Sequence, residues 1–68
     1  MIDQKNVCEL LGKKLGTNPK WEGNVCVIEN ADAILKVDEH AGVELHIKNP
    51  QKGQEIVHII RQVYTEVK

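Results

Sequence analysis

The chain has 68 residues and a net charge of −1, and aromatic residues make up only 3% of it. Twenty residues are valine, isoleucine or leucine, which is too apolar a composition for intrinsic disorder. A chain of this length predicts one small domain, residues 1–68, without an enzyme-sized cleft. The near-neutral charge gives no electrostatic reason to expect nucleic acid, because affinity for phosphates comes mostly from clustered Lys and Arg.

The start of the chain and the two cysteines indicate a cytoplasmic protein. Residues 1–5 lack the basic and then apolar layout of a signal peptide, and no apolar run approaches the roughly 20 residues that span a bilayer. Cys8 and Cys26 each lie in an apolar stretch, so we expect two buried, reduced thiols rather than a disulfide. Compactness alone suggests a bacterial or phage-like origin.

Residues 3–15 have the spacing of an amphipathic helix. Val7 and Leu11 lie in one apolar arc of a helical wheel, opposite a polar arc. Asp3 is the predicted N-cap, and Gly16 is the expected residue after the last turn.

The period of the apolar residues then changes to two, which predicts three strands in an antiparallel meander, over residues 23–29, 32–38 and 43–48. The inward side chains set the register between the second and third strands. The predicted inward pairs are Val37 with Val43, Leu35 with Leu45, and Ala33 with Ile47. The outward pairs are then Lys36 with Glu44, Ile34 with His46, and Asp32 with Lys48. Opposite charges in two of these pairs support the register.

The first strand can face two ways. If Val25 and Val27 point inward, a three-residue turn follows. If Cys26 and Ile28 point inward, Asn30 and Ala31 form a two-residue turn, but Glu29 then faces Asp32. We favour the first arrangement because it avoids this like-charge pair.

The last helix is predicted over residues 50–67. Asn49 is its expected N-cap and Pro50 its first residue, where the missing N–H costs nothing. From residue 54 onward the apolar side chains fill one arc of the wheel, which must cover the sheet. The sequence therefore predicts an α+β domain of two layers, in the order α-β-β-β-α, with both helices on one face of a three-stranded sheet.

This order of elements resembles the double-stranded RNA-binding domain and the small toxin ribonucleases that share its fold. In that domain a Lys-rich start of the last helix contacts phosphates, whereas residues 49–55 here hold one base and one acid. The catalytic His of the toxin relatives lies on the first strand, where this chain has Gly23, Asn24 and Val25. The resemblance makes a nucleic-acid-binding module the alternative function. Its candidate contacts are Lys13, Lys14, Lys20 and Lys52.

Catalytic and metal-binding patterns are weak in this sequence. The chain has no Ser, which removes a Ser-His-Asp triad, and only one Arg. The cysteines and the three His show no spacing typical of zinc ligands, so we expect no metal and no cofactor. His46 with Glu44 or Asp32 is the remaining enzymatic hypothesis, because His titrates near neutrality. We expect the protein not to be an enzyme.

The outward face of the sheet is the candidate site. In the favoured register a small apolar centre is rimmed by charges, which suits a protein contact. The predicted interaction residues are Cys26, Ile28, Ile34, Lys36, Glu44 and His46. Trp21 is expected to cover the edge of the core rather than to bind. The function predicted from the sequence is a small interaction or regulatory module that binds a protein partner or itself as a homodimer.

Overall fold

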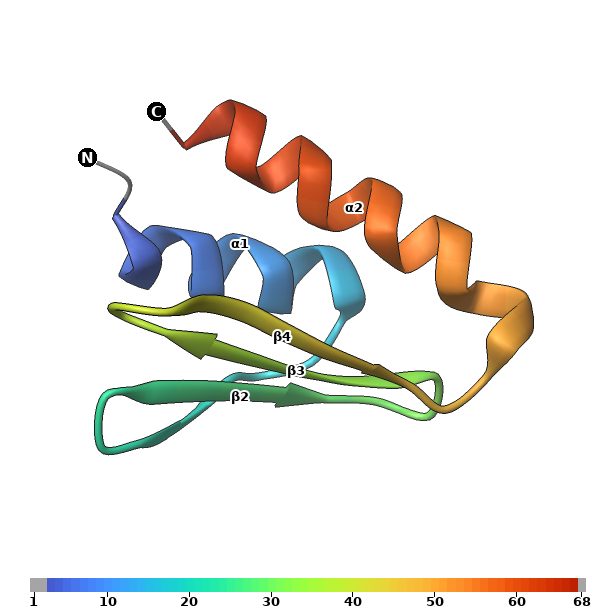
Figure 1. Cartoon of the computed structure of the whole chain (residues 1–68), viewed down its shortest axis with the longest axis horizontal. Coiled ribbons are helices and arrows are strands. Elements are labelled where there is room, and N and C mark those ends of the chain that lie inside the picture. Colours follow the sequence, from blue (N-terminus) through green and yellow to red (C-terminus); the bar gives the residue numbers. More distant parts are fainter. Residues whose placement is uncertain (1–2, 68) are drawn as a thin grey trace.

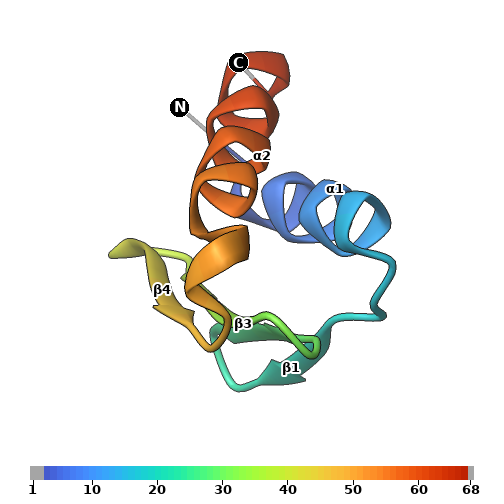
Figure 2. The ribbon, with the colours of Figure 1, turned by 90° about the vertical axis from the view of Figure 1, so that its right-hand side faces the viewer.

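The computed structural model describes residues 3–67, which form two helices packed on one face of a four-stranded antiparallel sheet (Figures 1 and 2). The elements are α1 (Gln4–Leu15), β1 (Lys20–Glu22), β2 (Val25–Glu29), β3 (Ala33–Asp38), β4 (Gly42–Ile47), the short 3₁₀ turn η1 (Pro50–Lys52) and α2 (Gly53–Glu66). The α+β class is confirmed, but the order is α-β-β-β-β-α rather than the predicted α-β-β-β-α. The extra strand also departs from the element order on which the resemblance to the RNA-binding domain rests. Neither helix in residues 3–67 is long and apolar enough to cross a membrane.

Helix α1 has the predicted capping residues, although its first residue is Gln4 rather than residue 3. The Asp3 side chain accepts a hydrogen bond from the backbone N–H of Lys5 at 3.0 Å, which caps the first turn. Gly16 adopts a left-handed conformation, with φ of 69°, and ends the helix. The chain after it folds back along α1, where the N–H of Thr17 donates to the carbonyl of Gly12 at 2.9 Å.

The strand that the sequence interpretation missed is β1, a three-residue edge strand whose residues are all exposed. It pairs with β2 through a two-residue turn, because Glu22 lies opposite Val25. Gly23 fills the first turn position with φ of 64°, the conformation that a type II′ hairpin turn requires there. Residues 23 and 24 therefore belong to a turn and not to the predicted strand 23–29.

The side chains of β2 face opposite to the favoured prediction, which placed Val25 and Val27 inward. Cys26 and Ile28 point into the core, opposite Val37 and Leu35 of β3. The cause lies in the turn, where the Asn30 side chain accepts hydrogen bonds from the N–H groups of Asp32 at 2.8 Å and Ala33 at 2.9 Å. The turn residues are thus 31 and 32 rather than 30 and 31. The repulsion between Glu29 and Asp32 does not arise, because Glu29 lies opposite Ile34 instead.

The predicted register between β3 and β4 is confirmed. Its observed pairs include Ala33 with Ile47, Leu35 with Leu45, Val37 with Val43, Lys36 with Glu44, and Ile34 with His46. Beyond the strand ends, the N–H of Lys48 donates to the carbonyl of Asp32 at 2.7 Å, which continues the same register. The predicted helix 50–67 is divided in the structure: the Asn49 side chain caps η1, which begins at Pro50, and α2 begins only at Gly53.

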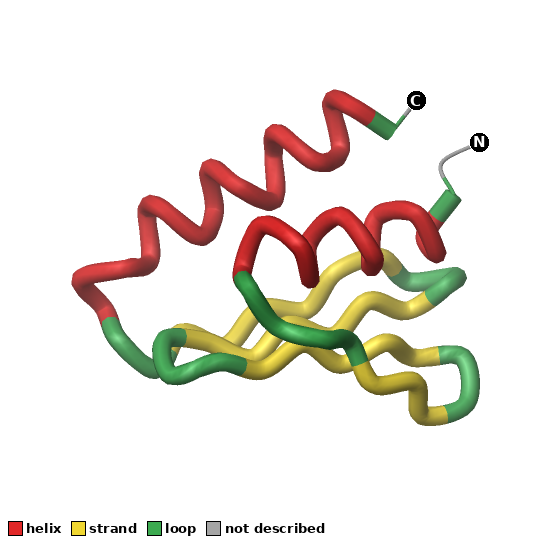
Figure 3. Tube along the Cα trace, turned by 180° about the vertical axis from the view of Figure 1, so that it is seen from behind, coloured by secondary structure: helices red, strands yellow, loops and turns green. Residues whose placement is uncertain are grey.

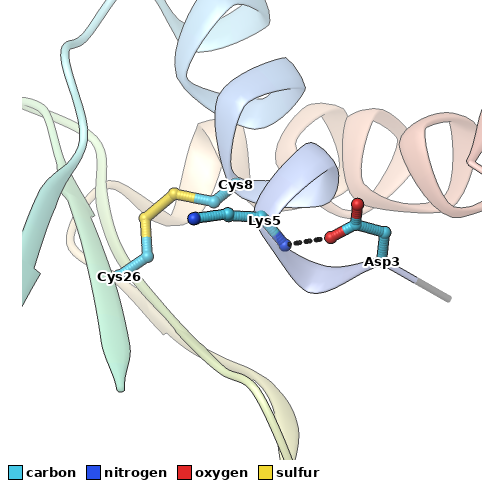
Figure 4. The surroundings of a disulfide bond; sticks show 4 residues. All are labelled: Asp3, Lys5, Cys8 and Cys26. Carbon is cyan, nitrogen blue, oxygen red and sulfur yellow. Dashed lines mark hydrogen bonds between the residues drawn. A yellow bond between two sulfur atoms is a disulfide. The ribbon is translucent and has the colours of Figure 1, made fainter. Parts of the chain in front are cut away.

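The core lies between α1 and the middle of the sheet, and a disulfide crosses it. Cys8 of α1 is bonded to Cys26 of β2, with their Cα atoms 6.4 Å apart (Figure 4). Both residues are fully buried. The prediction of two reduced thiols is therefore wrong, because α1 crosses directly above β2 and brings the two residues within the ordinary Cα separation of a disulfide.

Candidate interaction surface

The face of the sheet away from the helices, called here the outer face, carries three aliphatic side chains. Val25 and Val27 come from β2 and Ile34 from β3, and all three are half-buried. Val25 and Val27 are two residues apart on one strand, and Ile34 is the diagonal cross-strand neighbour of Val27. They form a continuous aliphatic strip, and both helices lie on the opposite side of the sheet (Figure 3).

The predicted interaction residues divide into two groups. Ile34 together with Lys36, Glu44 and His46 lies on the outer face, and the three polar side chains are exposed. Cys26 and Ile28 do not belong to this surface, because they are buried in the core. Val25 and Val27 take their place. The signal that could have identified them is Asn30, whose side chain holds the tight turn that fixes the facing of β2.

Charged residues flank the aliphatic strip in every cross-strand row. Val25 has Glu22 on one side and Asp38 on the other. Val27 lies between Lys20 and Lys36, and the same row ends at Glu44. Ile34 lies between Glu29 and His46. The surface next to Val25 is hollowed, and Lys36, Asp38 and Glu44 line the hollow. Each aliphatic side chain thus shares its row with at least one carboxylate.

Two polar contacts organise the end of this surface next to η1. Lys48 binds Glu29 across the sheet, and this hydrogen bond and the lysine charge lower the pKa of the Glu29 carboxyl. His46 Nε2 lies 3.3 Å from Glu44 Oε1 on the same strand. Glu44 therefore contacts His46, although Lys36 lies directly opposite it in the register.

The opposite end is shaped by Asp38, the last residue of β3. Its Oδ1 accepts hydrogen bonds from the backbone N–H groups of His40 at 2.8 Å and Ala41 at 3.2 Å. These bonds favour the ionised carboxylate and lower the pKa of Asp38. Asp38 therefore keeps its negative charge beside Val25 while it fixes the β3–β4 turn.

Trp21 lies at the β1 edge of the sheet. It is opposite Cys26, so its side chain is on the helix side rather than on the outer face. The ring is still 43% exposed. It covers the margin of the core only in part and contributes nothing to the aliphatic strip.

The four lysines of the alternative function do not form a separate basic surface. Lys14 Nζ lies 3.7 Å from Glu66, and Lys52 Nζ lies 3.4 Å from Glu55. Lys20 stands on the outer face in the row that ends at Glu44. An acidic side chain therefore accompanies three of these four lysines.

The enzymatic hypothesis concerns His46, which is mostly exposed and contacts Glu44 on open surface. Oδ1 of Asp32, the other suggested partner, accepts a hydrogen bond from the side-chain amide of Asn49 at 3.3 Å. Within residues 3–67, no three His, Cys, Asp or Glu side chains are grouped so that they could hold a metal ion.

The comparisons found no family model, no curated protein and no solved structure that matches this chain.

Proposed function

We propose that this protein is a small binding module without catalytic activity, which contacts a protein partner through the outer face of its sheet. The observation that carries the proposal is the aliphatic strip of Val25, Val27 and Ile34 on a face that neither helix covers. A strip of aliphatic side chains rimmed by charges is the surface composition that protein contacts use.

The charges around the strip favour a protein over a nucleic acid. A phosphate backbone needs a surface of one sign, whereas each row here holds a carboxylate beside the aliphatic side chain. Asp38 and Glu29 have lowered pKa values and stay ionised at neutral pH. A protein surface can match alternating charges pair by pair, so the partner is expected to present an apolar patch with charges of both signs.

Site-specific photocrosslinking tests the location of the contact. A photoreactive amino acid placed at Val27 or at Ile34 should form an adduct with the partner in cells, which mass spectrometry then identifies. The control position is His58, an exposed residue on α2. Equal adduct yields at all three positions would contradict the proposal, because they would show no preference for the outer face.

A pair of charge substitutions tests whether the strip provides the affinity. Ile34→Asp should abolish the adduct formed from position 27, because a carboxylate would be desolvated in the contact. Gln62→Asp, which adds the same charge on the exposed side of α2, should leave that adduct unchanged. Circular dichroism checks that both variants fold. Nucleic-acid binding that weakens steeply with salt in a gel shift would instead support the alternative function.

A further inference from the structure

The two edges of the sheet differ in how well they are protected. β1 has three residues, follows Pro19 and exposes the charged Lys20 and Glu22, all of which discourage strand addition. β4 is twice as long and forms the opposite edge, and no described strand pairs with its free side. A long edge strand is a template for pairing with another chain.

The hydrogen-bond pattern identifies which backbone groups of β4 are free. In an antiparallel ladder, residues whose N–H and C=O point to the partner strand alternate with residues whose groups point away. Lys48 donates to Asp32, so Gly42, Glu44 and His46 also point their groups toward β3. Val43, Leu45 and Ile47 therefore present three N–H and three C=O groups along the open edge.

The same three residues carry apolar side chains that are incompletely covered. Val43 and Leu45 are half-buried and Ile47 is 36% exposed, although all three point to the helix side of the sheet. Helix α2 begins close to the sheet and then rises away from it, so its later turns do not close over β4 (Figure 2). Ile59 and Ile60 of α2 are also only half-buried.

We propose that β4 pairs antiparallel with β4 of a second copy of this chain, about a two-fold axis at Leu45. Leu45 then lies opposite Leu45 of the second copy, and Val43 lies opposite Ile47. All three free residues form hydrogen-bonded pairs, with two bonds in each pair. The two sheets become one continuous sheet of eight strands, and the half-exposed aliphatic side chains of both copies cover one another.

Pairing of a carboxylate with an imidazole, which can donate a hydrogen bond to it, selects this register. Glu44 of each copy lies opposite His46 of the other, in the pairs where side chains approach most closely. A shift of two residues in one direction places Glu44 against Glu44. A shift in the other direction places His46 against His46 and leaves the backbone groups of Val43 beyond the partner strand. The strand is thus self-complementary in one register, as a two-fold contact requires.

Light scattering and sedimentation test the association itself. The protein should change from the 7.7 kDa monomer to twice that mass as its concentration rises from micromolar to millimolar. In the dimer, the amide hydrogens of Val43, Leu45 and Ile47 should be protected from exchange. A monomer throughout this range would overturn the proposal, and so would a dimer in which these three amides exchange freely.

A charge-swap cycle tests the register. His46→Glu places two like-charge pairs across the axis, so the dissociation constant should rise about tenfold. Adding Glu44→His to this variant restores opposite partners and should restore the dissociation constant. Glu22→Lys, on the other edge, is the control and should have no effect. Failure of the double variant to recover would overturn the register. The crosslinks from positions 27 and 34 report on the outer face and not on the free edge of β4, so failure of the outer-face proposal would not affect this result.

Discussion

Helix α1 places Val7, Cys8 and Leu11 in the core, whereas α2, which is two residues longer, places only Ile56 and Val63 there. α1 packs against β2, β3 and α2, and the disulfide joins it covalently to the sheet. Helix α2 packs mainly on α1 and rises away from the sheet toward its C-terminal end (Figures 1 and 2).

The difference shows that two amphipathic helices have different roles in the fold. α1 completes the core, and α2 covers α1 while it leaves apolar surface accessible near β4. Wheel diagrams do not distinguish these two roles, because both helices have an apolar arc. The roles become visible only in how deeply each arc is buried.

Matched truncations should reveal the largest difference between the helices. Leu11→Ala removes a fully buried side chain of α1, so it should lower the free energy of unfolding by about 3 kcal/mol. Ile60→Ala removes a half-buried side chain of α2 and should cost about half as much. Urea denaturation of both variants measures the two values. Equal losses of unfolding free energy would show that the side chains of α2 are packed as tightly as those of α1.

Loss of the disulfide should have the next largest effect. The bond closes a loop between residues 18 positions apart, for which the chain-entropy contribution is about 3 kcal/mol at most. The double variant Cys8→Ala, Cys26→Ala should therefore unfold at lower urea concentration. Dithiothreitol should shift the wild-type midpoint toward that of the variant and leave the variant itself unchanged. A variant as stable as the oxidised protein would contradict the anchoring role of this bond.

Glycine-to-alanine substitutions should have opposite signs in the two helices. A Cβ at Gly12 of α1 would lie 2.8 Å from the carbonyl oxygen of Thr17 and 2.9 Å from Cγ of Pro19. Gly12→Ala should therefore destabilise the protein, by about 2 kcal/mol, despite the better helix propensity of Ala. A Cβ at Gly53 of α2 meets only ordinary contacts, at 3.9 Å from Ile47, so Gly53→Ala should stabilise it by about 0.5 kcal/mol. Thermal denaturation of both variants gives the signs, and stabilisation by Gly12→Ala would refute the close contact.

The last prediction concerns the hydrogen bond between the helices. The Tyr64 hydroxyl donates to Oε1 of Gln4 at 3.0 Å, in a partly buried position. Tyr64→Phe removes this donor and should cost about 1 kcal/mol. Because only this bond is lost, combining Tyr64→Phe with Gln4→Ala should cost little more than Gln4→Ala alone. Additive losses in this double-mutant cycle would show that the two groups do not interact.

The sequence could predict the features that depend on local patterns. The period-two spacing of the inward residues Ala33, Leu35 and Val37 set the register of β3 against β4, and Asp3 and Gly16 marked the ends of α1. β1 escaped prediction because three exposed residues carry no buried alternation. Cys8 and Cys26 could not be paired from the sequence, because their proximity depends on where α1 crosses the sheet.

The candidate surface could also be predicted from the sequence only in part. Ile34, Lys36, Glu44 and His46 were placed on the outer face, because period-two alternation fixes the facing of their strands. Cys26 and Ile28 were predicted on the wrong face, because the facing of β2 depends on the Asn30 turn. A change of turn length by one residue moves every side chain of a strand to the opposite face of the sheet. The like-charge argument failed because it compared Glu29 with Asp32 in a register that the chain does not adopt.

The hydrogen bond from Tyr64 to Gln4 joins residues 60 positions apart, and this separation has a consequence for how the chain folds. The hairpins of the sheet link neighbouring segments and can form early, because closing a short loop costs little entropy. α1 finds its helical partner only after α2 is available. During synthesis on a ribosome, the meander is therefore expected to form first and to cover the sheet side of α1, while the side of α1 that packs on α2 stays accessible until α2 emerges.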